Sequence, residues 1–242
     1  MIIKVAHLSL GVKKAFSITF LSGLLLVSSV CAQTSGNGNT LLPGFSYLDE
    51  IIPDAIYDVR YYSENNFMGT RVDGYIAPKI ILTDEAAEVL VGVARELRKK
   101  DLILKFFDGY RPKRAVNHFI RWAADIEDVK MKSAYYPDVD KKDLFRLHYI
   151  AKKSGHSRGS TIDLTLVDAL TGKELDMASG FDFLGELSHH DNILISPQQL
   201  QNRNLLREVM VRHGFVPYSK EWWHYTLDDE PFPDTYFDFP VK

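Results

Sequence analysis

Hydrophobic residues recur at helical spacing in the first half of the chain. Ala86, Leu90, Val93 and Leu97 lie three or four residues apart, so they share one face of a helix. Thr83 precedes them and is a favourable N-cap residue, because its hydroxyl accepts a hydrogen bond from a free N–H of the first turn. The pattern predicts a helix that begins directly after Thr83 and buries its apolar face in the core.

Two more helices are predicted from residues that favour helix ends. Residues 113–124 follow Pro112, and proline is common at helix starts. Ser196 and Pro197 fit the N-cap and the first position of another helix. Gly214 ends that helix, since glycine readily adopts the left-handed conformation that terminates helices.

Polar and apolar residues alternate over six positions that begin at Thr161. The polar positions are Thr161, Asp163 and Thr165, and the apolar positions are Ile162, Leu164 and Leu166. Alternation with a period of two is typical of a strand with one buried face. We expect the apolar face to lie in the core and the polar face to direct Asp163 into a cleft.

Shorter patterns complete the predicted fold. Strands are expected at residues 79–82, 102–107 and 221–227, and short strands or extended segments at 47–62. Residues 125–142 are polar and irregular and predict a surface segment. The chain is therefore predicted to be a single α+β domain, with a small, mostly antiparallel sheet and helices packed around it.

The N-terminus has the pattern of a targeting segment. A basic start is followed by an apolar run at residues 16–30 and by the small residues Val30-Cys31-Ala32. This order predicts a signal peptide at residues 1–32 and export to the periplasm. A lipoprotein anchored through Cys31 is the alternative. The apolar run is too short for a membrane-spanning helix, so no stable membrane span is expected after cleavage.

The remaining chain divides into a leader and a domain. Residues 33–46 are rich in Gly, Asn, Ser and Thr and predict a flexible leader, and residues 47–242 are predicted to form one folded domain. The net charge of −3 gives no reason to expect a nucleic acid partner. Cys31 is the only cysteine and lies in the segment that is removed, so any metal must be held by histidine and carboxylate side chains. The sequence does not indicate an oligomeric state.

Four residues form a recognisable set for metal chemistry. His156 and Asp163 lie seven residues apart with Gly159 between them, and Glu221 lies three residues before His224. Three such side chains hold a zinc ion and leave one position for water, and the fourth takes that water's proton. Each pair alone has a simpler interpretation, a polar turn before a strand or an aromatic core strand. The combination favours a zinc site in a central cleft.

Two local geometries bear on this site. Residues three apart on a straight strand point to opposite sides, so we expect a turn near Glu221 with His224 entering the strand. Arg111 ends a buried strand just before Pro112, where a loop is held by a rigid scaffold. A surface salt bridge is the alternative interpretation of Arg111.

Together, these motifs resemble one family of enzymes. The patterns S-x-H-x-x-G-x-x-x-D at residues 154–163, E-x-x-H at 221–224 and D-G-Y-R-P at 108–112 are similar to those of the VanX-type zinc D-alanyl-D-alanine dipeptidases. The resemblance covers nearly all of the mature chain. One departure is Thr161, where the wider metallopeptidase superfamily usually has alanine; it does not affect a ligand.

The resemblance implies specific roles for five residues. His156, Asp163 and His224 would hold one zinc ion per chain. Glu221 would be the general base. Arg111 would stabilise the tetrahedral oxyanion, a role suited to a side chain that is always charged and presents a planar pair of donors.

Four further residues fall where the family holds the two ends of its dipeptide substrate. These residues are Tyr61, Tyr75, Ser154 and Asp182, and the resemblance places Asp182 near the free amine. One histidine of the pair His189-His190 is expected to orient a ligand or to shape the pocket. The other histidines of the domain are interpreted as structural or surface residues: His118, His148 and His213.

The implied activity is zinc-dependent hydrolysis of D-alanyl-D-alanine to two D-alanine molecules. One alternative is a D,D- or L,D-carboxypeptidase that acts on peptidoglycan stem peptides. Another is a zinc-holding cell-wall binding module without catalysis. Asp182 favours the dipeptidase, because it would bind a free amine. Glu221 and Arg111 argue against the binding module, since a purely structural site needs neither.

Overall fold

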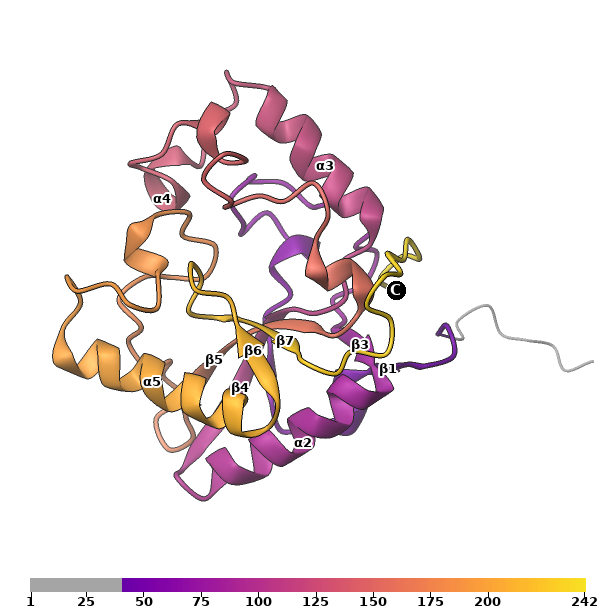
Figure 1. Ribbon diagram of the computed structural model, residues 1–242, viewed down its shortest axis with the longest axis vertical. Coiled ribbons are helices and arrows are strands. Elements are labelled where there is room, and N and C mark those ends of the chain that lie inside the picture. The colour runs from indigo at the N-terminus through magenta and orange to yellow at the C-terminus, as the bar shows by residue number, and fades with distance from the viewer. Residues whose placement is uncertain (1–40) are drawn as a thin grey trace, which may run out of the picture. The chain divides into compact units, whose positions relative to one another are not determined.

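A computed structural model describes residues 41–242 (Figure 1). The predicted signal peptide at residues 1–32 and most of the predicted leader lie outside the described residues. None of the described helices is both long and apolar enough to cross a bilayer.

A five-stranded sheet forms the centre of the domain, with the strand order β2-β4-β5-β7-β6. Every neighbouring pair is antiparallel except β2 and β4. The strands are β2 (Ile56–Tyr57), β4 (Leu102–Asp108), β5 (Thr161–Asp168), β6 (Phe215–Pro217) and β7 (His224–Leu227). The predicted α+β class with a small, mostly antiparallel sheet is confirmed.

A second, two-stranded sheet pairs β1 (Phe45–Tyr47) with β3 (Ile81–Thr83) in antiparallel orientation. Phe45 packs edge-on against Tyr110 and Phe239, and only 6% of it is exposed. The ordered domain therefore begins slightly before residue 47, because the last residues of the expected leader pair and pack with it.

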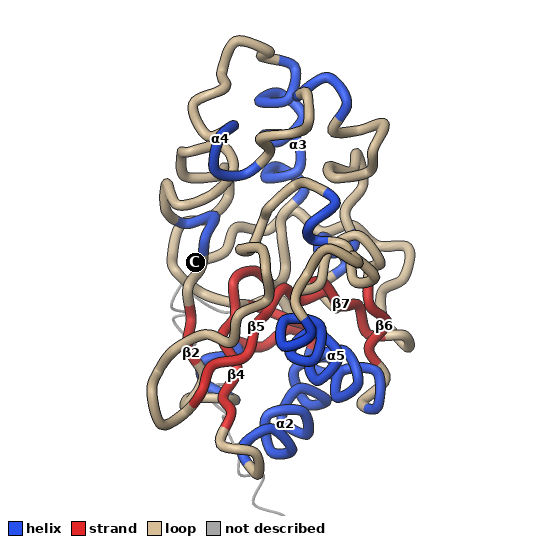
Figure 2. The backbone as a smooth tube through the Cα atoms, turned by 90° about the vertical axis from the view of Figure 1, so that its left-hand side faces the viewer, coloured by secondary structure: helices blue, strands red, loops and turns tan. Residues whose placement is uncertain are grey.

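The three long helices begin where the sequence predicts them. They are α2 (Asp84–Arg98), α3 (Lys113–Ala124) and α5 (Pro197–Arg212). Thr83 accepts a hydrogen bond from the N–H of Ala86, and Ser196 forms a reciprocal capping box with Gln199. In Figure 2, α2 and α5 lie on one side of the sheet, and α3 lies on the other side with long loops.

The connecting segments contain more structure than the sequence predicts. Most of residues 125–142 are exposed, as expected for a surface segment, but they include α4 (Lys132–Tyr135) and 3-10 helix η2 (Lys141–Asp143) and they bury Tyr136. Residues 47–62 are not only extended, since they include α1 (Leu48–Ile51) and η1 (Arg60–Tyr62). Both segments fold onto the core through aromatic side chains, although their polar composition suggests loops.

Strand register brings three acidic or histidine residues side by side. Asp108 at the end of β4 pairs with Asp163 in β5, and Asp163 pairs with His224 at the start of β7. The 3-10 helix η3 (Gly155–Arg158) precedes β5 and carries His156. Residues far apart in the sequence thus meet at one end of the central strands.

Candidate active site

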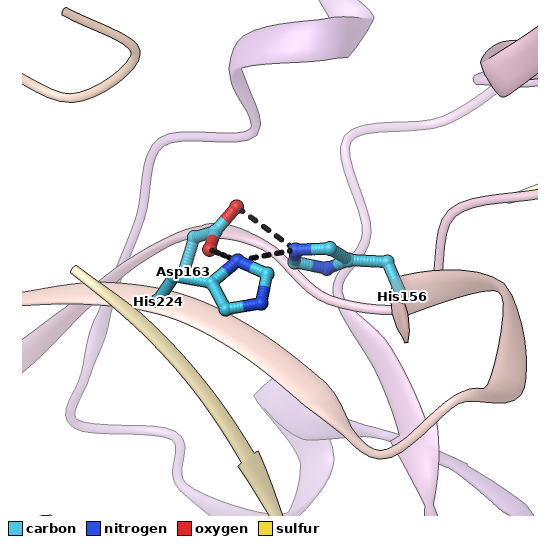
Figure 3. Close-up of side chains that lie close together, drawn as sticks. All are labelled: His156, Asp163 and His224. Atoms are coloured by element: carbon cyan, nitrogen blue, oxygen red, sulfur yellow. Dashed lines mark hydrogen bonds and ion pairs between the residues drawn. The ribbon is translucent and has the colours of Figure 1, made fainter. Parts of the chain in front are cut away.

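The side chains of His156, Asp163 and His224 converge on one point (Figure 3). Nε2 of His156 lies 3.2 Å from Nδ1 of His224 and 3.3 Å from Oδ2 of Asp163. Nδ1 of His224 lies 3.1 Å from Oδ1 of Asp163. Nitrogen and oxygen ligands of a tetrahedral zinc ion lie about 3.3 Å apart, because each is about 2.0–2.1 Å from the metal. The spacing therefore fits a metal ion held by all three.

The chemistry of the donor atoms also fits a cation. Oδ1 of Asp163 is buried and, although Nδ1 of His224 lies 3.1 Å away, it accepts no well-aligned hydrogen bond within the described chain, which is uncommon for a carboxylate. Burial opposes ionisation of Asp163, but the adjacent His156 and His224 outweigh it and hold its pKa below the usual value. Burial lowers the pKa of His156 to about 4, so its imidazole is neutral near pH 7. An ionised carboxylate and a neutral imidazole are the forms that bind metals.

His156 is oriented by the backbone of the D-G-Y-R-P motif. Its Nδ1 lies 2.8 Å from the carbonyl oxygen of Gly109, so Nδ1–H donates there and Nε2 keeps its lone pair for the metal. Gly159 ends η3 with a φ of +92°, in the left-handed region. The expected backbone turn at Gly159, between the two ligands, is present.

Glu221 lies beside the three ligands. Its Oε2 is 3.3 Å from Nδ1 of His224, and burial raises its pKa to about 7. The N–H of His224 donates to the carbonyl oxygen of Glu221 at 3.2 Å, which closes the expected turn before β7. The turn places both side chains on the same side of the sheet.

Arg111 is held against the site by Asp108. Its Nε donates to Oδ2 of Asp108 at 2.9 Å, its Nη2 lies 3.5 Å from Oδ2 of Asp163, and its guanidinium stacks 4.9 Å from the ring centre of Tyr61. The side chain is 12% exposed. A surface salt bridge, the alternative interpretation, is therefore wrong.

One cavity of about 250 Å³ contains these groups. Asp182 adopts a left-handed backbone with φ of 62°, and its Oδ1 accepts a hydrogen bond of 3.0 Å from the hydroxyl of Tyr61. Its Oδ2 is buried without a partner in the described chain. Burial, followed by the charge of Asp163, raises the pKa of Asp182 well above its usual value. The cavity is lined by all of the predicted site residues except Tyr75: Tyr61, Arg111, Ser154, His156, Asp163, Asp182, Glu221 and His224.

The sequence pattern of one family, described as D-Ala-D-Ala dipeptidase and belonging to peptidase family M15, matches residues 43–242. The chain belongs to this family. It is therefore an enzyme, a metallopeptidase, and the resemblance stated from its motifs is confirmed.

Several relatives share most of their length with the chain. A D-alanyl-D-alanine dipeptidase of Enterococcus faecium is 48% identical over 82% of this chain and 98% of its own length. The D-alanyl-D-alanine dipeptidase of Streptomyces coelicolor is 44% identical over 81% of this chain and 98% of its own length. That of Escherichia coli is 33% identical over 73% of this chain and 81% of its own length. Among solved structures, a mutant of the vancomycin resistance D,D-pentapeptidase VanY in complex with Zn(II) shares 16% identity over 64% of this chain and 76% of its own, with a TM-score of 0.38.

Tyr75 does not line the cavity of this family member. It is 2% exposed, and its hydroxyl donates to Oδ1 of Asp108 at 2.5 Å. The same carboxylate holds Arg111, and the expected contact of Tyr75 with the substrate stays a prediction. Sequence reasoning missed Asp108, although it begins the D-G-Y-R-P motif and ends a buried strand.

The remaining histidines divide into three groups. His148 is exposed, as expected for a surface residue, and it also lines the cavity. His189 and His190 lie outside the cavity, but Nε2 of His189 is 3.1 Å from the hydroxyl of Tyr149, which does line it. Nδ1 of His118 accepts from the backbone of Asp73, and His213 pairs with Glu96, so both are structural.

Proposed function

We propose that this dipeptidase-family enzyme hydrolyses D-alanyl-D-alanine to two D-alanine molecules, with one zinc ion on His156, Asp163 and His224. The observation that carries the proposal is the grouping of Glu221, Arg111 and Asp182 around one small cavity with the three ligands. Each of the three has a separate task in the hydrolysis of a short peptide. A non-catalytic binding module would need none of them.

Glu221 is the general base. A zinc ion bound to the three ligands would polarise the scissile carbonyl and acidify the attacking water. Glu221 takes the water's proton and then delivers a proton to the leaving amine. Its pKa of about 7, raised by burial, suits a group that both accepts and donates near neutral pH.

Arg111 donates to the oxygen on which negative charge develops. Asp108 fixes its guanidinium, so the donors are in place before the reaction and need not reorganise. One such donor is typically worth about 3–4 kcal/mol of barrier.

Asp182 favours a dipeptide over a longer stem peptide. Its buried, unpaired Oδ2 is a partner for a free ammonium group, whereas a stem peptide would present an uncharged amide at that position. The D,D- or L,D-carboxypeptidase alternative therefore ranks second.

The direct test is the turnover of three peptides by zinc-loaded mature protein. We expect release of alanine from D-Ala-D-Ala, and little from L-Ala-L-Ala or from a pentapeptide that ends in D-Ala-D-Ala. The control is Glu221→Gln, which should keep its zinc and lose about 10²–10⁴-fold in kcat. Faster turnover of the pentapeptide would identify a carboxypeptidase instead, and retained activity in Glu221→Gln would exclude its role as the base.

We further propose that the enzyme acts in the periplasm after removal of residues 1–32. The basic start, the apolar run and the small residues before Gln33 support this assignment. The mass of the protein purified from a periplasmic extract tests it. A lipid-modified product that begins at Cys31 would support the lipoprotein alternative.

A further inference from the structure

A second pocket of about 310 Å³ adjoins the catalytic cavity. Ser154 and Val116 line both spaces. The other residues that line the second pocket come from α3, from the segment that leads into η3 and from the C-terminal segment: Lys113, Asn117, Lys152, Lys153, Ser157, Asp234 and Tyr236. We call this space the outer pocket.

The outer pocket is positively charged. Three lysines line it against a single carboxylate, Asp234. None of Lys113, Lys152 and Lys153 forms an ion pair with any residue in the range 41–242. All three are exposed, and Nζ of Lys153 lies 5.5 Å from the ring centre of Tyr236, on the wall of the same pocket. An anion is the ligand that this charge favours.

Ser157 supplies a second, independent sign of a ligand. Its side chain is 1% exposed, its hydroxyl has no hydrogen-bond partner among the described residues, and it lines the outer pocket. Its backbone is fixed, because its N–H donates to Ser154 and its carbonyl oxygen accepts from Phe237. Buried hydroxyls without partners are uncommon, and a ligand in the pocket that Ser157 lines would supply an acceptor for this one.

The charges of the two spaces are arranged for a peptide that crosses from one to the other. Asp182 lines the catalytic cavity but not the outer pocket, so the ammonium end of a substrate belongs in the cavity. The lysines line the outer pocket alone, and Ser154 lies at the boundary. A peptide that leaves the cavity past Ser154 would place its carboxylate among the lysines.

We propose that the outer pocket binds the C-terminal carboxylate of a peptide one residue longer than the dipeptide, through Lys113, Lys152, Lys153 and Ser157. The inference rests on the proposed function of the catalytic cavity. Water would then add across the first peptide bond of D-Ala-D-Ala-D-Ala, and the products would be D-alanine and D-Ala-D-Ala. The second product is itself a substrate, so three D-alanine molecules form from each tripeptide.

The first experiment measures kcat/KM for D-Ala-D-Ala, for D-Ala-D-Ala-D-Ala and for the tripeptide amide, which lacks the terminal charge. We expect the tripeptide to be cleaved about tenfold better than its amide, because its carboxylate would interact with three lysines together. Lys152→Glu/Lys153→Glu should lower kcat/KM for the tripeptide about tenfold or more and leave the dipeptide within about twofold. Ser157→Ala should also lower kcat/KM for the tripeptide, but by a smaller factor.

The matched control is Lys99→Glu/Lys100→Glu, an adjacent and exposed pair that does not line either space. It should leave all three substrates unchanged. Three results would overturn the proposal. The first is equal kcat/KM for the tripeptide and its amide, and the second is an equal loss of kcat/KM for dipeptide and tripeptide in Lys152→Glu/Lys153→Glu. The third is an enzyme that cleaves the dipeptide but not the tripeptide.

The second experiment is independent of turnover. The dissociation constant of the tripeptide is measured calorimetrically on the Glu221→Gln protein, with and without Lys152→Glu/Lys153→Glu. We expect the added substitutions to weaken tripeptide binding about tenfold, and an unchanged constant would overturn the proposal. An absence of dipeptide hydrolysis in the wild type would instead contradict the proposed function, so the two failures are distinguishable.

Discussion

The hydroxyl of Tyr75 donates a hydrogen bond of 2.5 Å to Oδ1 of Asp108, while Oδ2 of the same carboxylate accepts from Arg111. Asp108 is fully buried and also lies 3.5 Å from Nδ1 of His156. One carboxylate therefore holds the guanidinium of Arg111 and lies beside the imidazole of His156. Charge-assisted hydrogen bonds of this kind fix geometry more strongly than neutral ones.

Substitution Asp108→Asn tests this positioning role. Tyr75 and Arg111 donate to different oxygens of Asp108, whereas an asparagine places a carbonyl oxygen at only one of these two positions and carries no charge, so it holds Arg111 less firmly. We expect kcat to fall about 10–100-fold, with a smaller change in KM and with zinc retained. Steady-state kinetics and zinc analysis of the same preparation check this result.

Tyr75→Phe is the graded control for that experiment. It removes one donor to Asp108 and leaves the contact between Asp108 and Arg111, so its loss in kcat should be smaller. A raised KM with unchanged kcat in Tyr75→Phe would instead support the substrate contact that the family resemblance implies.

Asp182→Asn should weaken substrate binding. Burial keeps the pKa of Asp182 high in the free enzyme, and an incoming ammonium group would compensate its charge. We expect KM for D-Ala-D-Ala to rise at least about tenfold, which corresponds to the loss of about 1.4 kcal/mol of binding. N-acetyl-D-Ala-D-Ala, which lacks the free amine, should be a poor substrate of the wild type. In Asp182→Asn, the values of kcat/KM for D-Ala-D-Ala and for N-acetyl-D-Ala-D-Ala should lie closer together than in the wild type. An unchanged KM would exclude Asp182 as the partner of the amine.

Local signals explain which parts of the structure the sequence predicts. Thr83 and Ser196 act within one helical turn, so the starts of α2 and α5 follow from neighbouring residues. The turn at Glu221 follows from the need to place two residues three apart on one side of a strand.

Other features depend on long-range packing and were not predicted. Tyr136 is buried against Trp122 from a segment whose polar composition suggests exposure. Tyr75 lies outside the cavity and bonds to Asp108, which lies 33 residues away in the sequence. The motifs list candidate residues for the site, but the register of β4, β5 and β7 determines which of these residues lie side by side.

His190 should make stability depend on pH. It is 3% exposed, and burial, followed by the charges of Arg207 and Arg203, lowers its pKa from 6.5 to about 4. The folded state therefore disfavours the charged form, so the stability linked to His190 is fully present above pH 6.5 and is lost as the pH falls towards 4. The full loss is about 3 kcal/mol.

Urea denaturation at pH 7 and pH 5 of the wild type and of His190→Gln checks this effect. The difference in unfolding free energy between the two pH values should be smaller in the variant. Comparing each protein with itself removes any constant cost of the substitution. An identical pH dependence in both proteins would show that His190 does not contribute.

Gly159→Ala should destabilise the domain and loosen the metal site. The residue has a φ of +92°, and an added Cβ would overlap the ring of Phe45 and lie 3.1 Å from Cγ2 of Thr83. The left-handed backbone costs a non-glycine residue about 1–2 kcal/mol. Overpacking against Phe45 adds about 1–3 kcal/mol.

Gly172→Ala separates these two costs. Gly172 has a φ of +68°, but an added Cβ would have no atom within 4 Å, so only the backbone cost applies. We expect Gly172→Ala to lose about 1–2 kcal/mol without a change in zinc affinity. Gly159→Ala should lose more and should also bind zinc more weakly, because Gly159 sets the path of the chain between His156 and Asp163. Equal losses of unfolding free energy and equal zinc affinities in the two variants would show that the contact with Phe45 does not shape the metal site.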